Sequence, residues 1–196
     1  MIGLNKNVAV LDFETTGFSP IASEPTEIAV ILLDGQTGEE MGSFDALLKI
    51  EGKIPEKVTE LTGITTEMLD KYGMDKALVK EYLQQMLNDA IIVAHNVQFD
   101  FAFLKEHFEI EPKYFYDTLV ISRQMYPSER SHTLGNICGR ANINLTGAHR
   151  AINDTRATVE LLKLQLVKDG VPKRFINTID TKQGIKFKPE NTIEVL

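Results

Sequence analysis

Hydrophobic residues recur with two different spacings along the chain, and these spacings predict strands in some segments and helices in others. Short runs that are apolar on both faces are typical of central strands in a covered sheet, and the clearest are residues 8–13 and 26–33. Turn-forming residues separate these two runs, namely Gly17, Ser19 and Pro20. The predicted strands cover residues 8–13, 26–33, 42–50 and 91–94.

Later in the chain, apolar residues recur every three or four positions, which indicates helices. The predicted helices cover residues 76–87, 99–108, 118–126, 133–141 and 152–167. Residues 61–65 are expected to form a loop and the start of a helix. Strands followed by helices, with no internal repeat, predict an α/β fold with a mixed central sheet flanked by helices on both faces.

The pattern weakens beyond Gly170 and Pro172, where short alternating segments lie between turn-forming residues at 175–179, 185–187 and 193–196. A length of 196 residues with 43% apolar residues fits one folding unit with an appendage. We therefore expect one domain over residues 1–167 and a C-terminal tail, residues 168–196, that forms a hairpin or a docking segment.

The composition favours a reducing compartment and no membrane partner. The longest aliphatic run, Ile28–Leu33, is too short to cross a bilayer, and Asp12 interrupts the N-terminal segment before an export signal could form. The single cysteine, Cys138, excludes an internal disulfide and a cysteine-based zinc site. A cytoplasmic protein is the expectation.

The formal charge of -7 argues at first against a nucleic-acid ligand, because Lys and Arg dominate phosphate binding. The charge is uneven, since residues 168–196 carry a net +2 and residues 1–167 a net -9. A phosphate-containing substrate of the main domain would therefore have to meet either a local basic patch or bound cations.

Acidic residues appear where the apolar pattern predicts the protein interior. Side chains alternate along a strand, so Asp12 and Glu14 continue the face of Val8 and Val10 and project together from the strand's end. A D-x-E pair is also common at solvated strand ends, and the pair alone leaves both interpretations open.

Two predicted helices also carry an acidic residue at a position where the apolar pattern predicts the protein interior. Asp100 lies on the same helical stripe as Leu104, and Asp154 lies on the stripe that includes Leu161. Asp100 also fits the alternative of an acid that stabilises a helix N-terminus. A carboxylate directed inward costs several kcal/mol unless a cation or hydrogen bonds compensate, so one shared explanation is expected for all four acids.

Divalent cations provide that explanation, because neither Lys nor Arg is spaced to pair with all four acids. Mg²⁺ prefers hard oxygen ligands, with Mn²⁺ as an expected substitute. Two Mg²⁺ ions would change the formal charge from -7 to about -3 and would form the missing phosphate-binding patch. Two ions about 4 Å apart can activate a water and stabilise the leaving oxygen of a phosphoryl displacement.

A histidine completes this chemistry. His149 lies five positions before Asp154, in the loop that enters the last predicted helix, and an imidazole beside the metal site can accept a proton from the attacking water. The alternative for His149 is an ordinary surface histidine. Of the others, His95 is expected to bond locally, His107 to lie on an amphipathic helix, and His132 to cap a helix or contact phosphate.

Three segments together resemble the exonuclease motifs of the DEDD superfamily in its histidine-bearing branch (DEDDh), which includes the proofreading epsilon subunit of bacterial DNA polymerase III. The matching segments are residues 12–17 (DFETTG), 95–100 (HNVQFD) and 149–154 (HRAIND), in the family's order and spacing. Residues 61–65 (LTGIT) are similar to another conserved stretch of the family. The resemblance covers about residues 6–167.

The resemblance implies a ribonuclease H-like fold and metal-dependent 3′→5′ hydrolysis that releases nucleoside 5′-monophosphates from single-stranded DNA, in proofreading or end-trimming. It implies that Asp12, Glu14 and Asp154 bind metal directly, that Asp100 holds the second metal partly through water, and that His149 is the general base. The implied substrate-binding residues are Thr15, Thr16, Gly17, Phe18, Asn96 and Phe99. Phe18 stands where a leucine often wedges against a base, and an aromatic ring there can stack.

Other functions remain open. The motifs are expected to bind the phosphate and the 3′ end rather than to distinguish the sugar, so a 3′→5′ exoribonuclease or oligoribonuclease is the near alternative. A ribonuclease H-like endonuclease fits the acids but not the position of His149, and a non-catalytic nucleic-acid-binding module would not need them. A DNA polymerase or another replication or repair protein is an expected partner, although the tail matches no known docking segment.

Five residues are candidates for guiding the phosphates of the strand, by side-chain chemistry alone: Lys113, Arg123, Arg130, His132 and Arg150. Ordinary surface charge is the alternative for each of them.

Overall fold

A six-stranded mixed sheet forms the centre of the molecule in the computed structural model, which describes residues 3–169 and 177–178. The strands lie in the order β3-β2-β1-β4-β5-β6. Their bounds are β1 (Val8–Thr15), β2 (Pro25–Leu33), β3 (Glu40–Leu47), β4 (Ile91–Ala94), β5 (Tyr114–Asp117) and β6 (Asn177–Thr178). β1, β4 and β5 run parallel, whereas β2, β3 and β6 pair antiparallel to their neighbours.

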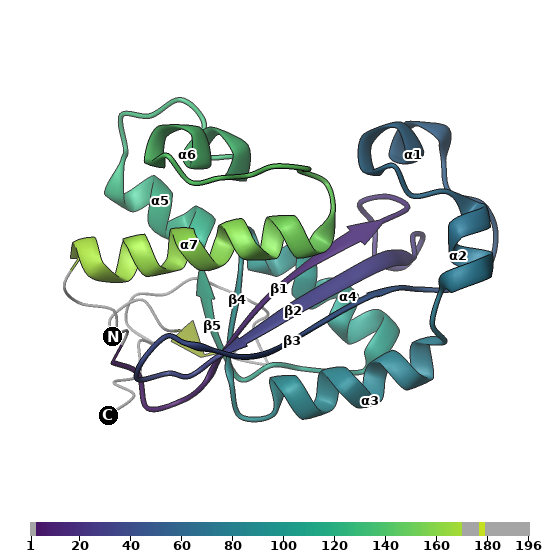
Figure 1. Cartoon of the computed structure of the whole chain (residues 1–196), viewed down its shortest axis with the longest axis horizontal. Helices are drawn as coiled ribbons and strands as arrows, with labels where there is room; N and C mark the ends of the chain where they lie inside the picture. The colour runs from purple at the N-terminus through teal and green to yellow at the C-terminus, as the bar shows by residue number, and fades with distance from the viewer. Residues whose placement is uncertain (1–2, 170–176, 179–196) are drawn as a thin grey trace.

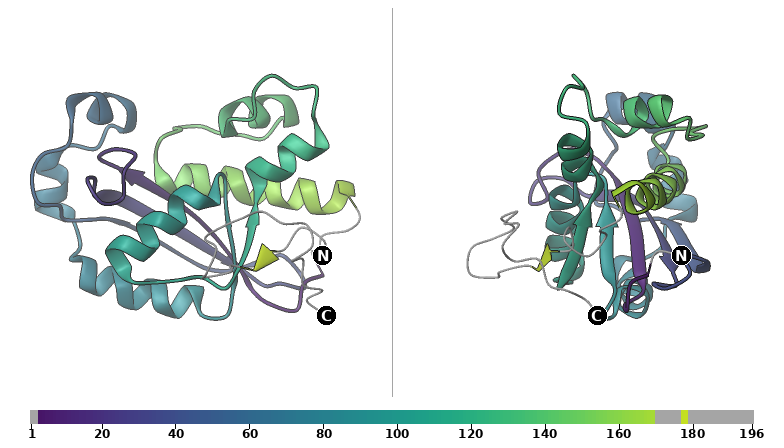
Figure 2. Two further views of the ribbon diagram at one scale, coloured as in Figure 1. Left: turned by 180° about the vertical axis from the view of Figure 1, so that it is seen from behind. Right: turned by 90° about the vertical axis from the view of Figure 1, so that its left-hand side faces the viewer.

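Helices cover both faces of this sheet, with α7 in front and α4 behind in the view of Figure 1, and the reverse in the left panel of Figure 2. The helices within the described residues are α1 (Glu56–Thr62), α2 (Thr66–Tyr72), α3 (Lys76–Leu87), α4 (Val97–Phe108), α5 (Thr118–Met125), α6 (Leu134–Ala141) and α7 (Ala151–Asp169). The α/β fold with a mixed sheet between helices is thus confirmed.

The two-residue alternation of β1 explains why the sheet has two separate cores. Ala9, Leu11 and Phe13 face α3 and α4 and pack in one cluster with Phe103. Val8 and Val10 face the opposite side and pack in a second cluster with side chains of α5 and α7. Since both faces are buried, the strands are apolar on both sides, as the sequence pattern indicated.

Three differences from the predicted elements have physical reasons. The four-residue strand β5 was missed because YFYD is too short to show a period. The helix α1 was missed because it has only seven residues. The loop and helix start expected within residues 61–65 are confirmed, since Gly63 in the left-handed region (φ 72°) ends α1 and Thr65 caps α2, although the seven-residue extent of α2 was not predicted. The predicted helix 99–108 starts two residues too late, since α4 begins at Val97. The earlier start is stabilised by Asp117, which accepts hydrogen bonds from the backbone N–H groups of Asn96 and Val97.

The tail contributes one described element. The short strand β6 pairs antiparallel with β5 and overlaps the predicted segment 175–179. The segments predicted at 185–187 and 193–196 lie outside the described residues, and so does the expected hairpin or docking role. Within the described part of the chain, no helix has both the length and the hydropathy of a membrane span.

Candidate active site

The acidic side chains meet at the edge of the sheet to which the parallel strands point. Asp12 and Glu14 lie in the last half of β1, Asp100 lies in the first turn of α4 directly after β4, and Asp154 lies in the first turn of α7. Ligand sites in such sheets form beyond the carboxyl ends of the parallel strands. The fold therefore brings residues from three distant segments to one place.

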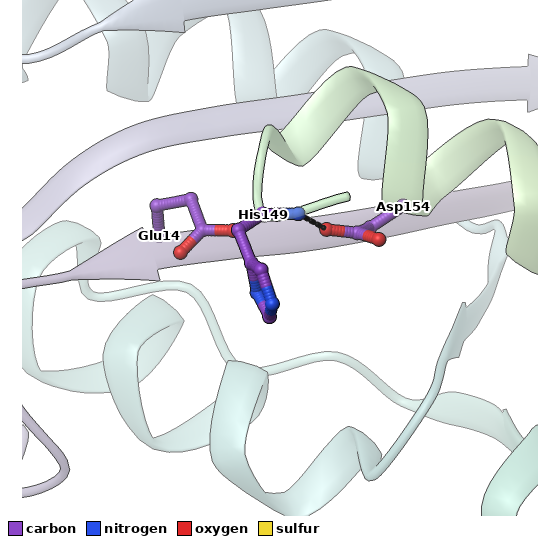
Figure 3. Close-up of side chains that lie close together, drawn as sticks. All are labelled: Glu14, His149 and Asp154. Atoms are coloured by element: carbon purple, nitrogen blue, oxygen red, sulfur yellow. Dashed lines mark hydrogen bonds between the residues drawn. The ribbon is translucent and has the colours of Figure 1, made fainter. Parts of the chain in front are cut away.

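Glu14, His149 and Asp154 form the tightest part of this cluster (Figure 3). Their nearest potential ligand atoms all lie within 4.8 Å of one another. The backbone N–H of His149 donates a hydrogen bond to Asp154 Oδ2 at 2.8 Å. The three residues line a cavity of about 460 Å³ together with Asp12, Phe13, His95, Thr133, Leu134, Gly135, Leu145 and Ala148.

The electrostatics of the cluster disfavour four negative charges. Burial raises the pKa of Asp12, and the charges of Asp100 and Asp154 raise it further. Burial also raises the pKa of Glu14 from 4.5 to about 7, with additional effects of Asp154 and Glu27. The pKa values of Asp100 and Asp154 are raised chiefly by burial as well. Each shift would be offset by a bound cation.

The donor set fits divalent metal ions. Asp100 is 3% exposed, and its buried Oδ1 has no hydrogen-bond partner among the described residues. A buried carboxylate oxygen without a partner is costly unless a cation binds it. Carboxylate oxygens are the ligands that hard divalent cations prefer, so these residues suit a magnesium-type ion.

His149 has an unusual backbone conformation. Its φ of 65° lies in the left-handed region, which is rare for a residue with a Cβ atom. The residue is exposed and lines the cavity, so solvent reaches its side chain. This placement fits a group that exchanges protons with water, and the strained backbone marks a site where local geometry is enforced.

The loop after β1 carries the predicted substrate-binding residues. The Thr15 hydroxyl donates to the Gly17 carbonyl at 2.7 Å, and Thr16 is fixed through bonds to the backbone of Glu24. Phe18 follows this fixed segment and is 93% exposed. An exposed aromatic ring on a fixed loop beside the cavity is suited to stacking on a base.

The other two predicted substrate residues lie at the start of α4, Asn96 directly before the helix and Phe99 in its first turn. Asn96 is exposed and left-handed (φ 82°), and Phe99 is half-buried against Phe103, with ring centroids 4.9 Å apart. Asp117, 3% exposed, accepts bonds from the backbone N–H groups of Asn96 and Val97 and from two N–H groups of α5. One buried carboxylate thus fixes the start of both helices.

The predicted phosphate-guiding residues do not form one group. Lys113 directly precedes β5 and therefore lies at the opposite edge of the sheet from the acidic cluster, so the structure does not support that role. Arg150 is paired with the buried Glu27 and is not a free surface cation. Arg123 and Arg130 are exposed, and Arg123 contributes to the lowered pKa of His95, which burial mainly causes.

The remaining histidines have local partners. His95 contacts the Thr118 hydroxyl at 2.9 Å and the His132 carbonyl at 2.8 Å, as expected for a local bonding role. The His132 ring bonds to Ser122 rather than to a helix N-terminus. On α4, the ring of His107 is bonded to the Pro20 carbonyl at 2.9 Å.

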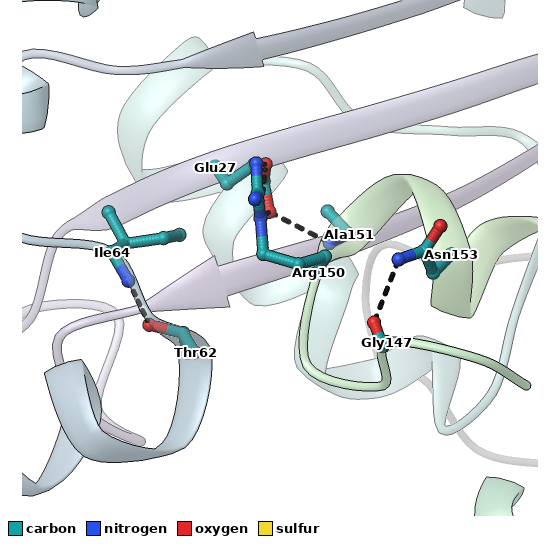
Figure 4. A network of polar contacts seen from close by, with 7 residues as sticks. All are labelled: Glu27, Thr62, Ile64, Gly147, Arg150, Ala151 and Asn153. Atoms are coloured by element: carbon teal, nitrogen blue, oxygen red, sulfur yellow. Dashed lines mark hydrogen bonds and ion pairs between the residues drawn. The ribbon is translucent and has the colours of Figure 1, made fainter.

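Sequence reasoning missed two buried acids, Glu27 and Asp117. Glu27 is 1% exposed, lies opposite Glu14 in the β1–β2 register, and bonds to Arg150 and to the backbone of Ala151 (Figure 4). The signal for Glu27 was an acid inside the aliphatic run of β2, and the signal for Asp117 was an acid directly between a strand and a helix.

Sequence comparisons agree with this geometry. A family model described as exonuclease, RNase T, matches residues 9–162. The PolC-type DNA polymerase III of Bacillus subtilis is 36% identical over 170 residues, which cover 84% of this chain and 12% of that protein. The corresponding protein of Thermotoga petrophila is 34% identical over an alignment of 201 positions, which covers 94% of this chain and 14% of that protein. The chain thus spans a small part of these relatives.

Solved structures share the fold. E. coli exonuclease I in complex with a dT13 oligonucleotide has a TM-score of 0.70 at 19% identity, covering 86% of this chain and 42% of that one. Exonuclease X in complex with 5′ overhanging duplex DNA has a TM-score of 0.68 at 17% identity, covering 96% and 98%. These are ribonuclease H-like exonucleases, and the family match over residues 9–162 shows that the chain belongs to the RNase T family of exonucleases.

Proposed function

We propose that this protein is a metal-dependent 3′→5′ exonuclease that releases nucleoside 5′-monophosphates from single-stranded DNA ends, in proofreading or end-trimming. The observation that carries the proposal is a cavity lined by Asp12, Glu14, His149 and Asp154, in a chain of an exonuclease family. The buried Asp100 lies close enough to Asp12 for its charge to raise the pKa of Asp12. Such a set of carboxylates is suited to two-metal phosphodiester hydrolysis.

The proposed roles follow the chemistry of the side chains. Asp12, Glu14 and Asp154 would hold the metals directly and Asp100 would hold the second one partly through water, with Mg²⁺ as the ion and Mn²⁺ as a substitute. Two bound ions supply charge neutralisation at the phosphate and activation of a water. His149 accepts the proton of the attacking water from its exposed position in the lining of the cavity.

The 3′-terminal nucleotide would lie on the loop after β1. Thr15, Thr16 and Gly17 form a fixed segment there, and Phe18 offers its exposed ring to a base. Asn96 and Phe99 would line the same subsite from the start of α4. Contacts of this kind bind the 3′ end of the nucleic acid and its phosphates and do not recognise a particular base sequence.

The biological setting is inferred from the relatives. We assign the exonuclease domain to residues 1–167, in line with the family match over 9–162. The PolC-type DNA polymerase III relatives suggest a replication context and a DNA polymerase or a repair protein as partner. A cytoplasmic location is part of the same proposal, in line with the replication context that these relatives suggest.

The test is a digestion series with 5′-labelled oligonucleotides of one sequence, as single-stranded DNA, duplex DNA, mismatched duplex and RNA. We expect Mg²⁺-dependent shortening from the 3′ end, fastest on single-stranded DNA, with mononucleotides as products. Faster shortening of RNA would instead assign the exoribonuclease alternative. Internal cuts, or no hydrolysis with either Mg²⁺ or Mn²⁺, would refute the proposal.

Two variants connect the activity to the residues. Asp12→Asn should reduce turnover about a thousandfold, because metal binding supplies several kcal/mol of transition-state stabilisation. His149→Ala should reduce it about a hundredfold or more while metal binding is kept. Asp34→Asn is the matched control, since Asp34 lies after β2 at the far end of the sheet and retains an acceptor for its bonds to residues 36 and 37.

A further inference from the structure

Glu27 is a buried acid outside the proposed metal ligands. It lies in β2 among aliphatic residues and is 1% exposed. A buried carboxylate is retained in a fold only if a cation and hydrogen bonds compensate its charge. The compensating groups come from the loop that enters α7, 123 and 124 residues further along the chain.

Both carboxylate oxygens of Glu27 are occupied by that loop (Figure 4). Arg150 donates from Nε to Oε1 at 3.0 Å and from Nη2 to Oε1 at 2.6 Å. The backbone N–H of Ala151, the first residue of α7, donates to Oε2 at 2.8 Å. Glu27 therefore fixes both a side chain and the main chain at the start of α7, and such charge-assisted bonds are strong and directional.

His149 directly precedes this fixed point. Its left-handed backbone is a conformation that contacts on either side have to maintain. On one side the Asn153 side chain donates to the Gly147 carbonyl at 2.8 Å, and on the other side lie the bonds of Glu27 to residues 150 and 151. The exposed imidazole is thus held mainly through its backbone.

We propose that Glu27 is a positioning residue for His149: its ion pair with Arg150 and its bond to Ala151 orient the loop so that the imidazole faces the cavity. This inference rests on the proposed function, in which His149 is the general base. A misplacement of about 1 Å at a reacting group costs up to about a hundredfold in rate. Loss of the contact should therefore lower kcat by about ten- to a hundredfold.

A second route from Glu27 to the site has to be separated from this one. Glu27 lies opposite Glu14 in the strand register, so a change at Glu27 also changes the charge beside a proposed metal ligand. The two routes differ in one respect, since only the route through the loop requires the imidazole of His149. A His149→Ala background therefore distinguishes them.

The experiment uses Glu27→Gln and, from the exposed side of the same contact, Arg150→Met, which avoids a change in the buried strand. For both variants, alone and combined with His149→Ala, kcat and KM are measured on single-stranded DNA. The imidazole resonances of His149 are measured in the two single variants, in the metal-free protein. Lys6→Met is the control for loss of an ion pair, because Lys6 pairs with Asp89 near the start of β1.

We expect both variants to lower kcat at least tenfold, whereas KM and the Mg²⁺ dependence should stay within about twofold of wild type. Both should shift the His149 resonances. In the His149→Ala background, neither variant should lower kcat further. A further loss in that background equal to the loss in wild type would overturn the proposal, as would unchanged kcat and His149 resonances in Arg150→Met. A wild-type protein without nuclease activity would refute the proposed function instead, and the resonances would still decide whether Glu27 orients His149.

Discussion

The acidic cluster makes the stability of the metal-free protein fall as pH rises. Glu14 has a pKa raised from 4.5 to about 7 by burial and by its acidic neighbours. Between these two values the folded protein binds more protons than the unfolded chain, so the free energy of unfolding decreases with pH in that window. Most monomeric proteins with ion-paired acids show the opposite slope at the acidic end of this range.

The size of the effect follows from the shift. A displacement of about 2.5 pKa units corresponds to about 3 kcal/mol, of which about 2.5 kcal/mol lies between pH 5 and pH 8. For a chain of this length, that corresponds to a decrease of about 5–10 °C in the melting temperature. The proposed Mg²⁺ ions require the ionised carboxylates, so Mg²⁺ at a concentration about a hundred times its Kd should restore about 2.7 kcal/mol at the upper end of the range.

The assay is chemical denaturation with a metal chelator at a series of pH values, repeated with Mg²⁺. Glu14→Gln should reduce the slope by the contribution of Glu14, about 2.5 kcal/mol between pH 5 and pH 8, because the residue no longer ionises. The contribution of Asp12, Asp100 and Asp154, whose pKa values are also raised by burial, should remain. Asp34→Asn is the control, since the backbone N–H groups of residues 37 and 36 lower the pKa of Asp34, whose titration lies below the measured window. A flat profile with chelator, or an equal slope in Glu14→Gln, would refute this account of the cluster.

Three further predictions concern the core, the helix starts and the substrate loop. Phe103→Ala should lower the free energy of unfolding by about 3–5 kcal/mol in urea titrations, because Phe103 is fully buried; a loss below about 1 kcal/mol would contradict its place in the core. Asp117→Ala should cost about 3 kcal/mol in the same assay, since four backbone N–H groups lose their acceptor, and Asp117→Asn should cost less. Phe18→Ala should leave stability within about 0.5 kcal/mol but weaken single-stranded DNA binding by about 1–3 kcal/mol in fluorescence titrations; unchanged binding would remove Phe18 from the subsite.

The sequence predicted the elements and acids whose pattern is local. The alternation of β1 correctly placed Asp12 and Glu14 on the face of Val8 and Val10, since strand geometry fixes side-chain direction. Helical spacing likewise placed Asp100 and Asp154 on buried stripes. These features depend only on residues a few positions apart, so they can be predicted from the sequence.

The parts that the sequence did not predict depend on contacts between distant segments. The partner of Glu27 lies at Arg150, and no local pattern connects a strand residue to a loop so far along the chain. The early start of α4 depends on Asp117, which supplies its acceptor from the end of β5. Lys113 was grouped with the phosphate-guiding residues by charge alone, and only the strand direction shows it at the other edge.

The position of β1 in the sheet has a consequence for hydrogen exchange. β1 is paired on both edges, with β2 and with β4, so the amides around Asp12 exchange only when a large part of the sheet opens. His149 lies instead in an exposed loop outside the sheet, and its amide is bonded to Asp154, so it is expected to exchange through a local opening that leaves the sheet intact. The carboxylates of β1 and the imidazole thus belong to regions with different opening equilibria, so hydrogen exchange at His149 should proceed while β1 stays paired.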